Sequence, residues 1–85
     1  MVVDMEQTYK INYTFATPQG DVVPDIAYVS GKDAKNAAMR LQNFINQMAY
    51  FNYAGRKLTE IQTIIPVEKV LKNVLIQTEK NGRLN

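Results

Sequence analysis

A strict alternation of side chains over Gln7–Ala16 constrains the fold more than any other feature of this sequence. Aromatic and β-branched residues occupy one parity, namely Tyr9, Ile11, Tyr13 and Phe15, and mainly polar residues occupy the other. Such alternation is typical of a strand with one buried face. The next four residues, Thr17 to Gly20, fit a type I turn whose glycine has a positive φ. The pattern predicts a hairpin whose second strand covers about Val22–Val29, with Pro24 at an edge or a bulge.

A long amphipathic helix is predicted after the hairpin. Ser30 to Asp33 have the spacing of a capping box, with Ser30 as the N-cap and Asp33 reaching back to it. Apolar side chains then recur every three or four residues, as expected for a helix packed on a sheet. They are Ala34, Ala37, Ala38, Leu41, Phe44, Ile45, Met48 and Phe51. We expect the helix to end near Phe51–Ala54, with Gly55 as its C-terminal glycine.

The C-terminal third contains one further strand and a segment with two interpretations. Leu58–Ile65 is rich in β-branched residues and lies between Gly55 and Pro66, which predicts a third strand. Pro66 suits the first turn of a second helix, and the apolar residues after it have helical spacing. The alternative makes Val74–Glu79 a fourth strand.

The element order predicts an α+β fold, a small two-layer ββαβα domain. One main helix packs on a three-stranded, mainly antiparallel sheet, and a second helix lies at the C-terminus. The third strand lies beside the first in an antiparallel 2-1-3 order, or else crosses over to lie parallel to the second. We expect one domain over residues 1–85, with residues 1–6 and 82–85 flexible. A core of this size is marginal, which favours a partner or a second copy of the chain.

The missing residue types exclude most chemistry. The chain has no Cys and no His, so it has no thiolate, no zinc–thiolate site and no side chain that ordinarily titrates near neutrality. A Gly-rich phosphate loop and calcium-loop spacing are also absent. We therefore expect no enzymatic activity, cofactor, metal or small-molecule substrate. The absence of a signal-peptide pattern and of a long apolar run predicts a cytoplasmic protein without a membrane partner.

The most unusual stretch is Leu41–Gly55, which contains no charged residue. The outward face of the predicted helix carries Arg40, Asn43, Gln47 and Tyr50. Solvated helix faces usually carry Lys and Glu, whereas interface cores are depleted in charge and enriched in tyrosine. The face is therefore a candidate docking surface for a protein partner or a second copy. The competing interpretation is an amide-rich solvated surface.

A second candidate site leads out of the helix. Tyr53, Arg56 and Lys57 combine an aromatic ring with two cations, a mixture suited to nucleic acid. Residues 40–85 hold seven basic and three acidic residues, against three and five in residues 1–39. No nucleic-acid-binding signature is matched, and basic residues at helix ends also complement the helix dipole.

The sequence thus predicts a small non-enzymatic binding or assembly module acting through a charge-free helix face. The alternative is a nucleic-acid-binding accessory protein that uses the basic C-terminal half. The composition, free of Cys, His and Trp and rich in Asn and Gln, resembles that of accessory proteins of phages and mobile elements.

Overall fold

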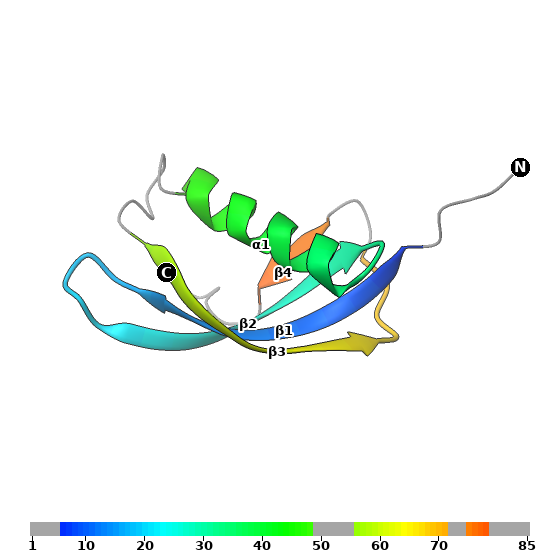
Figure 1. The fold of residues 1–85 in the computed structure, drawn as a ribbon, viewed down its shortest axis with the longest axis horizontal. Coiled ribbons are helices and arrows are strands. Elements are labelled where there is room, and N and C mark those ends of the chain that lie inside the picture. The colour runs from blue at the N-terminus through cyan, green and yellow to red at the C-terminus, as the bar shows by residue number, and fades with distance from the viewer. Residues whose placement is uncertain (1–5, 49–55, 72–74, 79–85) are drawn as a thin grey trace, which may run out of the picture.

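The structure, a computed structural model, describes residues 6–48, 56–71 and 75–78 of the 85-residue chain. Within these residues it is an α+β fold in which one helix packs on one face of a four-stranded antiparallel sheet (Figure 1). The sheet order is β3-β1-β2-β4. The elements are β1 (Gln7–Ala16), β2 (Val22–Gly31), α1 (Ala34–Met48), β3 (Lys57–Val67) and β4 (Ile76–Thr78).

The hairpin prediction is confirmed. β1 and β2 pair without interruption from Gln7 opposite Gly31 to Ala16 opposite Val22. Gly20 has a φ of 94° and donates its amide to the Thr17 carbonyl at 2.9 Å, as a turn glycine does. The predicted alternation also holds, because the Ile11, Tyr13 and Phe15 side chains are all buried.

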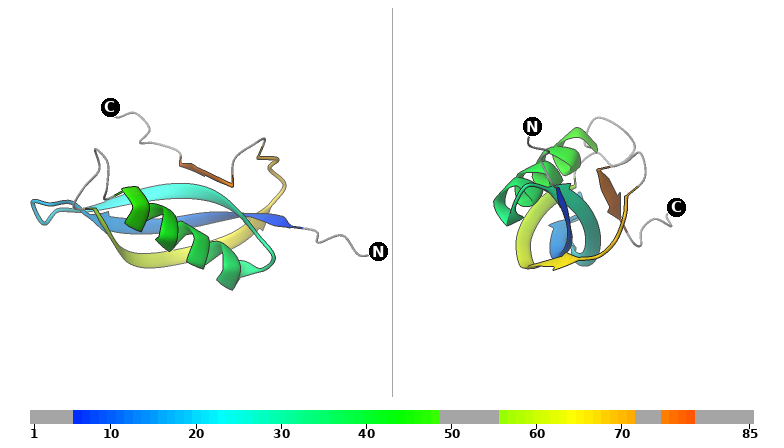
Figure 2. Two further views of the ribbon diagram at one scale, coloured as in Figure 1. Left: turned by 90° about the horizontal axis from the view of Figure 1, so that it is seen from above. Right: turned by 90° about the vertical axis from the view of Figure 1, so that its right-hand side faces the viewer.

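The predicted antiparallel 2-1-3 arrangement is present, because β3 pairs with the other edge of β1. This pairing shifts register twice, between Asn12 and Tyr13 and between Thr14 and Phe15. Each shift leaves an additional β3 residue unpaired, and such bulges bend a strand and increase its twist. β3 accordingly curves around the side of the molecule that carries α1 (Figure 2).

The predictions of a three-stranded sheet and a second C-terminal helix are wrong for the described residues. The alternative of a strand within Val74–Glu79 is correct, since β4 pairs antiparallel with β2. Pro66 does not begin a helix but lies near the end of β3, opposite Tyr9. The unpaired edge of β2 explains the outcome: it offers backbone partners such as the Ser30 amide, which donates to the Leu75 carbonyl at 2.9 Å.

The helix cap also differs from the prediction. Ser30 belongs to β2, and the N-cap of α1 is Asp33, whose Oδ1 accepts the Asn36 amide hydrogen at 2.7 Å. The Asn36 side chain makes a second bond at this helix start: its Oδ1 accepts the amide hydrogen of Lys32, the residue before Asp33, at 3.0 Å. The observed N-cap lies three residues after the predicted one, because β2 continues to Gly31 and Ser30 is therefore in strand conformation.

The core lies between α1 and the sheet. Its buried side chains come from β1, β2 and α1: Ile11, Tyr13, Phe15, Ala27, Val29, Ala37, Leu41 and Ile45. Gly31 allows the helix to approach β2 closely, since a Cβ there would lie 2.8 Å from the Ala37 backbone nitrogen. None of the described helical residues forms a segment long and apolar enough to cross a membrane.

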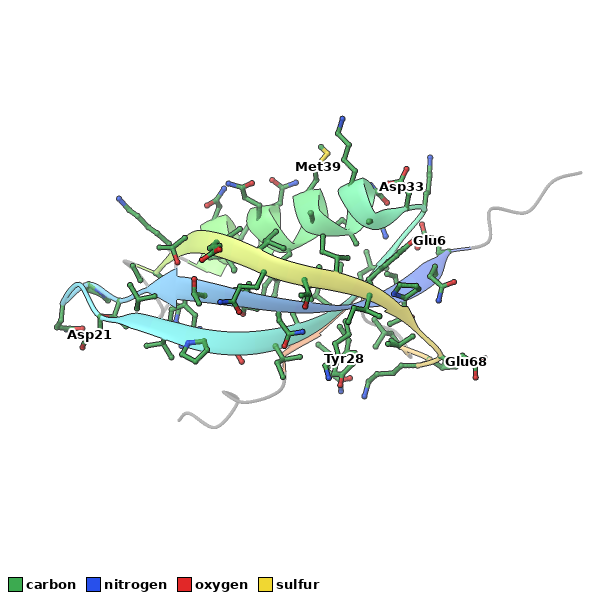
Figure 3. The ribbon with its side chains drawn as sticks, turned by 60° about the horizontal axis from the view of Figure 1, so that its bottom comes forward. Glu6, Asp21, Tyr28, Asp33, Met39 and Glu68 are labelled. Atoms are coloured by element: carbon green, nitrogen blue, oxygen red, sulfur yellow. The ribbon has the colours of Figure 1, made fainter. Side chains whose placement is uncertain are left out.

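The face of the sheet opposite α1 carries polar side chains that pair with one another. The Asn12 amide donates to the Thr63 hydroxyl at 2.7 Å. Tyr28 lies on this face (Figure 3), with the Lys69 Nζ 4.4 Å from the centre of its ring. The first contact joins β1 to β3, and the second joins the segment after β3 to β2.

Candidate interaction face on helix α1

The second half of α1 presents four uncharged amide side chains to solvent. We call Gln42, Asn43, Asn46 and Gln47 the amide face, because all four are exposed. None of their side chains makes a hydrogen bond with the described part of the chain. Met39, 55% exposed, lies one turn earlier and projects away from the sheet (Figure 3). The predicted positions Asn43 and Gln47 are thus accessible, and Tyr50 lies outside the described residues.

Arg40, the other predicted interface residue, is half-buried and already engaged. Its guanidinium donates to both carboxylate oxygens of Glu6, at 3.1 and 3.2 Å, and to the Ser30 carbonyl at 2.7 Å. The hydrogen bond from Arg40 holds the pKa of Glu6 below its usual range. Arg40 therefore ties α1 to β2 and to the residue before β1, and its charge is balanced by Glu6.

A groove of about 410 Å³ lies between α1 and β4, next to the amide face. Its walls are Arg40, Asn43, Phe44, Gln47, Leu75 and Ile76. Leu75 is 54% exposed, so part of the apolar lining is open to solvent. The groove was not predicted, because the helical spacing after Pro66 had indicated a second helix that contains Leu75 and Ile76. The competing strand assignment for Val74–Glu79 was the signal that could have revealed it.

The structure describes two of the three residues predicted for nucleic-acid binding, Arg56 and Lys57. Tyr53 lies outside the described residues. The Arg56 guanidinium carbon lies 4.3 Å from the centre of the Phe15 ring, a cation–π contact, and the Arg56 side chain is half-buried. Lys57 is exposed at the start of β3, opposite Ala16. Arg56 thus covers the rim of the core.

A buried hydrogen-bonded pair near the hairpin was not predicted. Asp25 is 6% exposed, and its Oδ2 accepts the hydroxyl hydrogen of Tyr13 at 3.1 Å. Its Oδ1 accepts the amide hydrogen of Ile26 at 2.8 Å. Burial raises the pKa of Tyr13 well above its usual value, and the nearby Asp25 carboxylate raises it further.

Both oxygens of Asp25 are therefore occupied by partners within the fold. The groove is lined by other residues, so this pair does not border it. Among the described residues no three acidic side chains gather closely enough to hold a metal ion. The pair has the properties of a structural contact, because a buried carboxylate is tolerated when its hydrogen bonds are satisfied.

Comparison with known proteins gives no match: no family model, no curated protein and no solved structure is similar enough to inform the function.

Proposed function

We propose that this chain is a non-enzymatic assembly module that binds a second copy of itself through the amide face and the adjoining groove. The observation that carries the proposal is the combination of four exposed, uncharged amides with an apolar groove beside them. Interface centres are depleted in charge, whereas solvated helix faces usually carry Lys and Glu.

The chemistry of the face favours a second copy over a different partner. In a two-fold symmetric dimer, residues near the axis meet the same residues of the other protomer. A charged face would repel itself in that arrangement, but an amide carries both donors and an acceptor and can bond its own copy. The adjacent Arg40 does not oppose this contact, because Glu6 balances its charge.

The size of the molecule supports the same proposal. Eight buried apolar side chains form the core of the described residues, and the sequence contains no cysteine to cross-link it. Small domains bury a lower fraction of their surface and are often stabilised by oligomerisation. A specific interface takes up about 800 Å² on each partner. The exposed Met39, one turn before the amide face, and the exposed Leu75, in the wall of the groove, supply apolar area for it.

The test is sedimentation velocity on the wild type and on two variants with the same change in net charge. Asn43→Glu with Gln47→Glu places like charges on the proposed axis, while Lys35→Glu alters an exposed residue in the first turn of α1. We expect the wild type and Lys35→Glu to dimerise. The double variant should keep its circular dichroism and lose affinity by about a hundredfold, because unpaired charges are costly to desolvate. A wild type that remains monomeric at every concentration contradicts the proposal.

The same preparations test the nucleic-acid alternative. Binding of a mixed-sequence oligonucleotide at low salt, abolished by Arg56→Glu with Lys57→Glu and weakened steeply by added salt, would favour that function. Self-association through amides should depend little on salt. The engagement of Arg56 with the Phe15 ring leads us to expect no oligonucleotide binding.

A further inference from the structure

Among the described residues, β2 is paired along only part of its outer edge. β4 pairs with Ala27–Val29, and Leu75 accepts from the Ser30 amide. The preceding residues, Val22–Ile26, have β1 on one side and no described strand on the other. We call Val22–Ile26 the open segment. Unpaired strand edges are templates on which another strand can add, and native proteins usually block them.

The direction of the backbone groups shows what the open segment offers to another strand. Alternate residues of a strand direct their N–H and C=O groups to the same side. Because the Ser30 amide points to β4, the groups of Val22, Pro24 and Ile26 also point away from β1. These three residues would therefore form the hydrogen bonds to an added strand.

Two of the three donors are missing or already used. Pro24 has no N–H, and the amide hydrogen of Ile26 is accepted by Asp25 Oδ1 at 2.8 Å. Val22, the first residue of the strand, is the remaining donor in the open segment. The N–H groups of an added strand could therefore donate to the carbonyls of the open segment. The carbonyls of the added strand would find a donor only at Val22, at one end of the segment.

The Asp25 side chain is held in this position from inside the core. Its second oxygen accepts from the hydroxyl of Tyr13, which is 1% exposed. Rotating the carboxylate away from the Ile26 amide would leave the Tyr13 hydroxyl buried without a partner, which is unfavourable.

We propose that Asp25, together with Pro24, is an edge guard that closes the open segment of β2 to strand addition. The guard prevents the open segments of two copies from joining their sheets. It is independent of the proposed function, since it would operate in a monomer as well. Its consequence is that copies of this chain meet through surfaces other than this edge.

The experiment removes the guard without leaving a buried hydroxyl unpaired. Both test proteins carry Tyr13→Phe, which removes the buried hydroxyl, and Pro24→Thr, which restores the N–H that proline lacks. One also carries Asp25→Leu, which has no acceptor, and the control carries Asp25→Asn, whose amide oxygen can still accept from Ile26. We expect the leucine protein to form concentration-dependent assemblies, measured by sedimentation, that are larger than any dimer formed by both proteins through the amide face. Equal sedimentation of the two folded proteins would overturn the proposal.

Amide hydrogen exchange in the wild type gives a second test that does not depend on the folding of any variant. The guard predicts that the Ile26 amide exchanges at least about tenfold more slowly than the Val22 amide, after correction for intrinsic rates, because only Ile26 has an acceptor. Exchange of Ile26 as fast as that of Val22 would show that the amide is open and would refute the guard.

Discussion

The buried Tyr13–Asp25 hydrogen bond predicts how the stability of this fold responds to alkali. Burial of Tyr13 and the carboxylate beside it raise the tyrosine pKa in the folded state above the value of about 10 in an unfolded chain. The protonated phenol therefore stabilises the folded protein fully below pH 10. That contribution falls as the pH rises above 10, because only the unfolded chain then releases the proton.

The size of the effect follows from the contact. A hydrogen bond to a charged acceptor contributes about 2 kcal/mol, so Tyr13→Phe should lower the free energy of unfolding by about that amount at pH 8. Above pH 10 the wild type loses about 1.4 kcal/mol per pH unit relative to the variant. The two stabilities should therefore become equal about 1.5 pH units above 10, near pH 11.5.

Urea unfolding of both proteins, followed by circular dichroism between pH 8 and about pH 11.5, measures this difference directly. Other groups that titrate in this range affect both proteins alike and cancel in the comparison. Parallel pH profiles for the wild type and Tyr13→Phe would refute the reasoning. Such a result would mean that the Tyr13 hydroxyl ionises as readily in the folded protein as in the unfolded chain.

Two further predictions concern local structure, each measured by urea or thermal unfolding. Asp33→Ala should destabilise the fold by about 1 kcal/mol through loss of the cap, whereas Ser30→Ala should change its stability by less than about 0.5 kcal/mol. A larger loss for Ser30→Ala than for Asp33→Ala would instead support Ser30 as the N-cap. Gly31→Ala should cost about 1–3 kcal/mol because its Cβ would meet the Ala37 backbone, and Gly20→Ala about 1 kcal/mol because its φ is positive. Unchanged melts for both glycine variants would exclude these local constraints.

The elements specified by short-range patterns were predictable from the sequence. The alternation of β1, the turn with Gly20 and the apolar repeat of α1 are all determined by residues within a few positions of one another. Each pattern indicates one type of secondary structure, since side chains return to the same face every two residues in a strand and about every 3.6 residues in a helix. The exposure of Asn43 and Gln47 followed from the same helical repeat.

The features that depend on distant parts of the chain were missed. β4 exists because the edge of β2 supplies partners about 50 residues earlier in the sequence, which local helical spacing does not reveal. The groove was missed for the same reason, since β4 forms one of its walls. The role of Asp25 depends on Tyr13, its neighbour across the hairpin, and a carboxylate in a strand gives no pattern that distinguishes it from a solvated one.

The two prolines in strands connect these edges to the way in which copies of the chain can meet. Pro66 lies opposite Tyr9, and because the flanking residues of β3 direct their backbone groups to β1, its missing N–H is at the outer edge of the sheet. Pro24 occupies the equivalent position on the outer edge of β2. The bulges of β3 bend its edge as well, so both long edges resist pairing with another strand. Helix α1 has no such obstacle on the amide face, whose groups are uncharged and complementary to themselves. An association that depends on helix side chains should therefore respond to Asn43→Glu with Gln47→Glu and be insensitive to Pro66→Thr, a variant that restores only an edge donor.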